Sequence, residues 1–267
     1  MSKILYSLFF LIFFLCMAFL VVQIGYSHQN CLEASVVFDA DMGPTRSPLS
    51  SGSTIPHHIH QTWKEREIPP QYQHLVQEIK KLHPTYIYTL WTDKDNLDFV
   101  RAHFPWFLPT YMSYEKHIKR ADAARYLWLY VHGGVYMDLD SVTLRPLDTL
   151  LEGRDMLFGY AESKKNKNNA IPNAFMAIAP RHPFMAWVLK QLPKTKHLDV
   201  VYATGPNFLT HCLRQWKLDR YPYVLDMPVL FTHPWHKKIS TNQHNLEQLR
   251  KDYPQSHVTT FWTHSWK

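Results

Sequence analysis

A nearly unbroken apolar run over residues 4–24 constrains this chain more than any other feature of its sequence. Roughly twenty apolar residues are the length at which a helix crosses the hydrocarbon core of a bilayer. A cleaved signal peptide is the alternative, but its apolar core is usually about 7 to 15 residues long and ends at small residues. Here residues 20–23 prolong the run, which favours a signal anchor.

The N-terminal side of this run carries a single charged side chain, Lys3. A positive charge there favours a cytoplasmic N-terminus, so residues 1–26 are predicted to form a cytoplasmic tip and a transmembrane helix. Residues 27–54 contain Gly-Pro, Ser-Pro and Ser-Ser-Gly-Ser segments, which are typical of a flexible stem. The folded, luminal domain is then expected over residues 55–267.

Composition fits one globular domain. The chain has 267 residues, of which 46% are hydrophobic and 19% are charged. The formal charge of +7 is dispersed, and the basic run over 164–167 has the character of a solvated loop, so no nucleic-acid partner is expected. Cys16 falls inside the apolar run, which leaves Cys31 and Cys212 either to pair or to remain thiols.

The order of predicted segments is that of an α/β fold. Residues 55–63 are predicted to form a first strand that ends in a polar loop, and residues 86–91, which are aromatic and β-branched, a second strand. Residues 71–82 between them have helical character. Such a strand–helix–strand unit favours a mainly parallel sheet. Apolar spacing further predicts a helix over 114–131, strands over 135–139, 156–160 and 174–179, and a helix over 184–192.

Two acidic residues, Asp138 and Asp140, stand at the end of the predicted strand over 135–139. Side chains two apart on a strand point to one face, so this pair can share a hard cation through oxygen ligands. Such a cation would neutralise a diphosphate leaving group. An Asp-x-Asp pair alone is a weak signal, but here Gly133 and Gly134 supply a helix stop and a tight turn before the strand.

Two further charges, Asp122 and Arg125, lie three residues apart on the helix predicted over 114–131. This spacing puts them on one face of the helix, where they can act together. The alternative is an ordinary helix ion pair, which contributes about 0.2 to 0.5 kcal/mol.

Three histidines in the first predicted strand, His57, His58 and His60, raise the question of a zinc site. The chain has 17 histidines in all, and neither a cysteine cluster nor a His-Glu-x-x-His motif accompanies these three. Structural or solvent-facing histidines are therefore favoured over a zinc site.

Taken together, these segments resemble a known family. The blocks RADAARY over residues 120–126 and GGVYMDLD over 133–140 look like the DXD-containing glycosyltransferases of the GT-A fold. This family includes fungal inositol phosphoceramide mannosyltransferases and the initiating α-1,6-mannosyltransferase. Residues 55–63 and 90–93 look like its first two strands, and residues 204–206 and 265–266 are more weakly similar.

The more distant glucosylating clostridial toxins share an Asp-x-x-Arg helix, a Tyr-x-Asp-x-Asp strand and a late Ser and Trp. The residues that match these features, in order, are Asp122, Arg125, Tyr136, Asp138, Asp140, Ser265 and Trp266.

The resemblance implies a role for each carboxylate and for the arginine. Asp122 would hold hydroxyls of the donor sugar or ribose, and Arg125 would contact the sugar or its phosphate. Asp138 would bind ribose or sugar, directly or through the metal. Asp140 would be the principal carboxylate ligand of a Mn²⁺ or Mg²⁺ ion.

Other donor-site residues follow from the same resemblance. Trp63 would line the nucleobase site, and Tyr136, Ser265 and Trp266 belong to the donor-binding set. His264 is a candidate metal ligand, although members of the family often place histidines a few positions before Ser-Trp, whereas His264 directly precedes Ser265.

The implied protein is a retaining hexosyltransferase whose catalytic domain lies in the lumen of the Golgi or ER, anchored by residues 4–24. Mannose from GDP-mannose is the favoured donor, with a sphingolipid (inositol phosphoceramide) or a glycan as acceptor. One alternative is an α-galactosyl or N-acetylglucosaminyl transferase that uses a UDP-sugar. Two others are a catalytically silent glycan-binding relative and, more remotely, a zinc hydrolase or phosphodiesterase.

Overall fold

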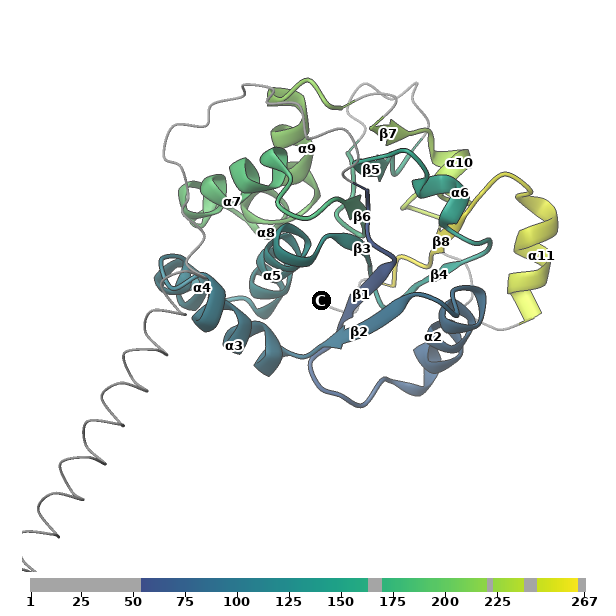
Figure 1. Ribbon diagram of the computed structural model, residues 1–267, viewed down its shortest axis with the longest axis horizontal. Helices are drawn as coiled ribbons and strands as arrows, with labels where there is room; N and C mark the ends of the chain where they lie inside the picture. The colour runs from purple at the N-terminus through teal and green to yellow at the C-terminus, as the bar shows by residue number, and fades with distance from the viewer. Residues whose placement is uncertain (1–53, 163–169, 220–222, 238–243, 264–267) are drawn as a thin grey trace, which may run out of the picture.

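The computed structural model describes residues 54–162, 170–219, 223–237 and 244–263 (Figure 1). The predicted membrane helix over 1–26 and the stem up to residue 53 lie outside these ranges and stay predictions. Within the described ranges, no helix combines the length and the apolar character needed to cross a membrane.

A mixed sheet of six strands in the order β2-β1-β3-β6-β5-β7 forms the centre of the domain. Its first three strands are parallel, β6 is antiparallel to both of its neighbours, and β5 and β7 are parallel. A second sheet pairs two short antiparallel strands. The strands are β1 His58–Thr62, β2 Ile87–Trp91, β3 Gly134–Met137, β4 Ser141–Thr143, β5 Met156–Gly159, β6 Phe175–Ile178, β7 Val224–Leu225 and β8 Val258–Thr260.

Helices cover both faces of the central sheet (Figure 1). One face packs against α3 Asp93–His103, α4 Leu108–Ser113, α5 His117–His132, α7 Pro183–Thr195 and α9 Pro206–Gln215, with α8 Val200–Ala203 beside them. The other face packs against α2 Pro70–Leu82, α6 Asp148–Leu151, α10 Met227–Leu230 and α11 His244–Asp252.

Strand β3 shows how the sequence builds this sandwich. Its side chains alternate between the faces, with Tyr136 in the core beneath α5 and Val135 and Met137 in the core beneath α2. The predicted α/β class with a mixed sheet is therefore confirmed, as are the strands and helices expected from the 3.6- and 2-residue periods.

The turn between α5 and β3 requires glycine. Gly133 and Gly134 have φ angles of +63° and +96°. A Cβ atom on Gly134 would lie 2.4 Å from the carbonyl oxygen of His58, because β1 passes directly beside β3 at this point. The predicted helix stop at these two residues is confirmed.

The histidines of β1 have structural partners. His60 is buried; its Nδ1 accepts a hydrogen bond from Trp91 Nε1, which can only donate, so its Nε2 carries the proton and donates to the Gly133 carbonyl. His58 Nε2 lies 2.9 Å from Thr89 Oγ1, and His57 stacks on Tyr86.

Candidate active site

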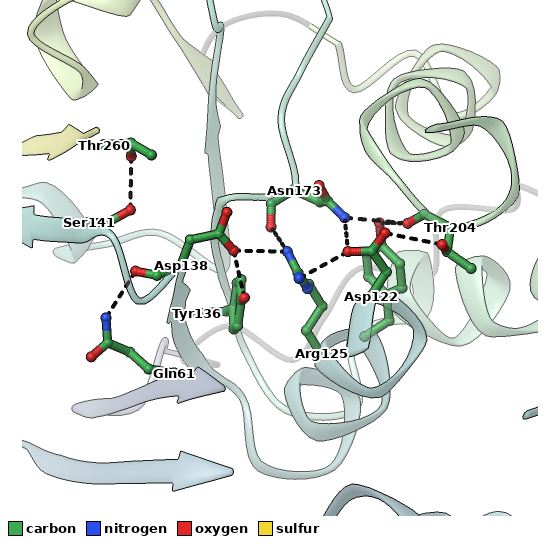
Figure 2. Close-up of polar contacts among 10 residues, drawn as sticks. Gln61, Asp122, Arg125, Tyr136, Asp138, Ser141, Asn173, Thr204 and Thr260 are labelled. Atoms are coloured by element: carbon green, nitrogen blue, oxygen red, sulfur yellow. Dashed lines mark hydrogen bonds and ion pairs between the residues drawn. The ribbon is translucent and has the colours of Figure 1, made fainter. Parts of the chain in front are cut away.

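Four of the predicted functional residues, Asp122, Arg125, Tyr136 and Asp138, meet at the edge of the sheet where β3 ends (Figure 2). Asp138 directly follows β3, while Asp122 and Arg125 lie near the middle of α5. Because α5 runs back antiparallel to the strand that follows it, the start of α5 and the end of β3 lie at the same edge. This geometry brings together residues that are 13 to 16 positions apart.

Arg125 is the centre of the cluster (Figure 2). Its Nη2 lies 2.9 Å from Asp122 Oδ1, and its Nη1 lies 3.1 Å from Asp138 Oδ1 and donates to the Asn173 carbonyl at 2.9 Å. The guanidinium also lies 4.4 Å from the centre of the Tyr136 ring. One buried cation therefore joins two carboxylates from different elements.

Asp122 is fixed from three sides. Besides Arg125, Asn173 Nδ2 donates to Oδ1 and Thr204 Oγ1 donates to Oδ2, each at 3.1 Å. Burial raises the pKa of Asp122 to about 6, while the charge of Arg125 opposes this rise. The pair is a buried part of a network rather than an ordinary surface ion pair, since the side chains of Asp122 and Arg125 are only 5% and 4% exposed.

Asp138 connects this network to solvent. Its Oδ1 accepts from Arg125 and from the Tyr136 hydroxyl, the latter at 2.6 Å, and its carbonyl accepts from Gln61 Nε2 at 3.0 Å. The Asp138 side chain is 34% exposed, so a bound molecule can reach it.

Asp140 is held by the C-terminal segment instead. Its Oδ2 accepts from the Thr263 backbone N–H at 2.7 Å and from Thr263 Oγ1 at 2.8 Å. The Tyr72 hydroxyl, 3.0 Å from the same Oγ1, completes a chain from α2 to the carboxylate. Burial, followed by the charge of Asp138, raises the pKa of Asp140 to about 6.

The expectation that a strand aligns the two carboxylates on one face is wrong. Strand β3 ends at Met137, and a turn closed by Ser141 N–H donating to the Asp138 carbonyl carries residues 138–140 toward β4. The strand alternation does not apply in a turn. The two carboxylates interact electrostatically, but each is held by a different element.

The donor set fits a hard divalent cation. Asp140 is a buried carboxylate next to a second carboxylate, and a cation would relieve the cost of ionising both. In the described part of the chain, no three His, Cys, Asp or Glu side chains gather closely enough to hold a metal by themselves. Mg²⁺-type sites commonly use one or two carboxylates and complete the shell with substrate phosphates and water.

The remaining predicted residues divide into two groups. Trp63 directly follows β1 and packs edge-on against Tyr72, whose hydroxyl forms the hydrogen bond with Thr263 Oγ1. His264, Ser265 and Trp266 lie outside the described residues, so their roles stay predictions. The same holds for a Cys31–Cys212 pair, because Cys31 is outside them; Cys212 itself is buried in α9.

Sequence reasoning missed four polar partners that shape the site: Gln61, Asn173, Thr204 and Thr263. Asn173, Thr204 and Thr263 come from loops far from the acidic motif in sequence and belong to no periodic pattern. Gln61 lies in the predicted first strand and Thr204 in the weakly similar segment over 204–206, but neither similarity marked the residue as part of the site.

A comparison with models of protein families identifies the class of protein. Residues 69–157 match the family model described as "Glycosyltransferase sugar-binding region containing DXD motif". This stretch extends from the start of α2 to β5 and contains Asp122, Arg125, Tyr136, Asp138 and Asp140.

Individual relatives of known name show which members of this family the chain is similar to. Inositol phosphoceramide mannosyltransferase 1 of Schizosaccharomyces pombe is 31% identical over 234 residues, which cover 81% of this chain and 72% of the relative. Inositol phosphoceramide mannosyltransferase 3 of the same yeast is 38% identical over 174 residues, or 63% of this chain and 47% of the relative. The chain thus spans about half the length of several of these relatives. It belongs to the family of DXD-containing glycosyltransferases that includes them.

Among solved structures, the PaToxG glycosyltransferase aligns with a TM-score of 0.49 at 19% identity, over 61% of this chain and 69% of that one.

Proposed function

We propose that this chain is a metal-dependent, retaining glycosyltransferase that moves a hexose from a nucleotide sugar to a lipid or glycan acceptor. The observation that carries this proposal is the Arg125 network, which joins Asp122 to the partly exposed Asp138 beside the buried Asp140. Family membership supplies the reaction class.

Each residue of the cluster suits a part of the reaction. Asp138 and Asp140 would hold Mn²⁺ or Mg²⁺, which as a Lewis acid stabilises negative charge on a departing diphosphate. Arg125, fixed by two carboxylates and unable to lose its proton, adds positive charge near the same edge. Asp122 presents a carboxylate in a fixed orientation, suited to accepting hydrogen bonds from sugar hydroxyls.

The names of the relatives support a mannosyl donor and an inositol phosphoceramide acceptor. We favour GDP-mannose as donor and inositol phosphoceramide as acceptor, because the matched relatives bear the name inositol phosphoceramide mannosyltransferase. Trp63 would line the nucleobase site, and Ser265, Trp266 and His264 would complete the donor and metal sites. Residues 4–24 would anchor the chain in the Golgi or ER membrane with the domain in the lumen.

The test is donor turnover by the purified full-length chain. GDP-mannose and a panel of UDP-sugars are supplied with and without Mn²⁺, and both hydrolysis and transfer to inositol phosphoceramide are measured. We expect Mn²⁺-dependent turnover of GDP-mannose that is lost in Asp140→Asn, a substitution that keeps the size of the side chain and removes its charge.

Two outcomes would redirect the proposal. Turnover of a UDP-sugar in place of GDP-mannose would make the chain a galactosyl or N-acetylglucosaminyl transferase. Metal-dependent binding of a nucleotide sugar without turnover, by a folded protein, would favour a catalytically silent glycan-binding role.

A further inference from the structure

Four large apolar side chains are exposed around helices α4 and α8. Trp106 and Met112 lie before and within α4 and are 43% and 47% exposed, while Leu198 and Tyr202 lie before and within α8 and are 39% and 55% exposed. Single exposed apolar residues are common on proteins, whereas a group at one place marks an interaction surface.

Hydrogen bonds hold these segments side by side. Lys119, near the start of α5, donates from Nζ to the carbonyl oxygens of Lys196 and Leu198 at 3.1 and 2.6 Å. Arg120 donates from Nη2 to the Met112 carbonyl at 3.3 Å. Figure 1 shows α4 and α8 at the same side of the domain, next to α5. We call this region, residues 106–120 and 194–203, the end surface.

The end surface is also basic. In its two segments Glu115 and Asp199 are the only acidic residues, against five lysines and arginines: Lys116, Lys119, Arg120, Lys194 and Lys196. Apolar and aromatic side chains surrounded by lysines are the composition of surfaces that enter the boundary of a bilayer, where lysines attract anionic headgroups. This charge pattern favours an anionic membrane over a neutral one.

The end surface borders the candidate active site. Tyr202 is two residues before Thr204, whose hydroxyl donates to Asp122. Helix α5 begins at the end surface, at His117, and carries Asp122 five residues further on. The first turns of α5 therefore connect the solvent-exposed end surface to the Arg125 network.

We propose that the end surface lies against an anionic lipid bilayer, with Trp106, Met112, Leu198 and Tyr202 in the interfacial layer. This orientation would present the headgroup of a membrane lipid to the site beside Asp122. That last consequence rests on the proposed function, whereas contact with the bilayer does not. The apolar run over 4–24 would supply a membrane close to the domain.

Hydrogen exchange of the intact chain in lipid nanodiscs tests the contact. Nanodiscs of phosphatidylcholine alone are compared with nanodiscs that also contain phosphatidylserine, and exchange is followed in peptides covering the end surface. We expect slower exchange of these peptides in the anionic nanodiscs, and no change in peptides that cover β2, an edge strand of the central sheet outside the end surface.

Two matched variants sharpen the test. Tyr202→Ser with Lys116→Glu and Lys196→Glu should abolish the extra protection, because each lysine contributes roughly fivefold to contact with an anionic surface. The control, Ile87→Ser with Lys81→Glu and Lys251→Glu, changes one exposed apolar residue and two exposed lysines elsewhere and should keep it.

Equal exchange in the two lipids, or equal loss of protection in both variants, would overturn the proposal. No sugar donor or acceptor is present in this experiment. A chain that shows lipid-dependent protection but no donor turnover would therefore retain the membrane contact and lose the proposed function.

Discussion

The two halves of the candidate site differ in how their carboxylates are balanced. In the helix half, Asp122 and Asp138 share the guanidinium of Arg125. In the C-terminal half, Asp140 accepts hydrogen bonds from Thr263, whose donors are neutral. One half thus carries its own counter-charge within the chain.

Because of this difference, we expect substitutions in one half to affect mainly stability and substitutions in the other to affect mainly function. A buried ion pair is costly to break, because removing one member leaves an uncompensated charge. A buried carboxylate without a cationic partner costs free energy to ionise until a cation binds it. We therefore expect changes in the helix half to unfold the protein and changes at Asp140 to disable it.

The largest effect is expected for Arg125→Ala. The change leaves Asp122 buried without its counter-charge and should lower the free energy of unfolding by about 3 to 5 kcal/mol, as measured by urea denaturation. Arg125→Lys keeps the charge but loses the two-pronged geometry, so its loss should be smaller.

Helix α3 offers a matched control for this variant. Asp98 and Arg101 have the same three-residue spacing but are 47% and 55% exposed. Arg101→Ala should leave the unfolding midpoint unchanged within error, because an exposed pair is screened by water. An equal loss in the two alanine variants would contradict the role assigned to the Arg125 network.

The next prediction, for Asp140→Asn, is a gain in stability rather than a loss. The pKa of Asp140, about 6, lies above the ordinary value of 3.8, so without metal the folded state binds a proton that the unfolded state releases. Stability is therefore lost as pH rises from about 4 to 6, and Asp140→Asn should be more stable at neutral pH by roughly 3 kcal/mol. Urea denaturation with a chelator present checks this, and a marked destabilisation would show that Asp140 is chiefly structural.

Thr263→Val should have a smaller effect. It removes the hydroxyl that donates to Asp140 and keeps the backbone N–H, at a cost of about 1 kcal/mol in unfolding free energy. Thr263→Ser restores the hydroxyl and should recover most of the loss in thermal unfolding. If serine and valine behave alike, the Thr263 hydroxyl does not support Asp140.

The smallest effect concerns mild acid. Burial, then the charge of His58, lowers the pKa of His60 to about 3, so His60 stays neutral in the folded protein while the unfolded chain takes up a proton below pH 6.5. Stability should therefore fall by about 0.7 kcal/mol for this residue between pH 7 and pH 6. Urea denaturation at pH 7 and pH 6 checks this, and His60→Gln should reduce the difference in stability between the two pH values. If the difference is unchanged in His60→Gln, it arises from other titratable groups.

The sequence predicted the helix half far better than the C-terminal half. Asp122, Arg125 and Tyr136 follow helix and strand periods, and a helix that leads directly into a strand brings them together. Thr263 contacts Asp140 across 123 positions, and no local pattern encodes such a contact. The turn at Asp138 also escaped prediction, because an apolar run does not reveal where strand pairing stops.

Some of the fold could also have been predicted but was not. Helix α3 begins with a capping box in which Thr92 and Asp95 exchange hydrogen bonds, a signal visible three residues apart in the sequence. Its first four residues are all polar, and the polar Asn96 is buried beside Phe99 and Val100, so periodicity alone gave little indication of a helix.

The most direct test of the account is Mn²⁺ binding to the full-length chain, followed by electron paramagnetic resonance in the presence of GDP and, separately, UDP. We predict that one nucleotide supports stoichiometric Mn²⁺ binding, that Asp140→Asn abolishes it, and that Arg101→Ala leaves it intact. Unchanged Mn²⁺ binding in Asp140→Asn, or no binding with either nucleotide by the folded chain, would contradict the assignment of Asp140 to a metal site.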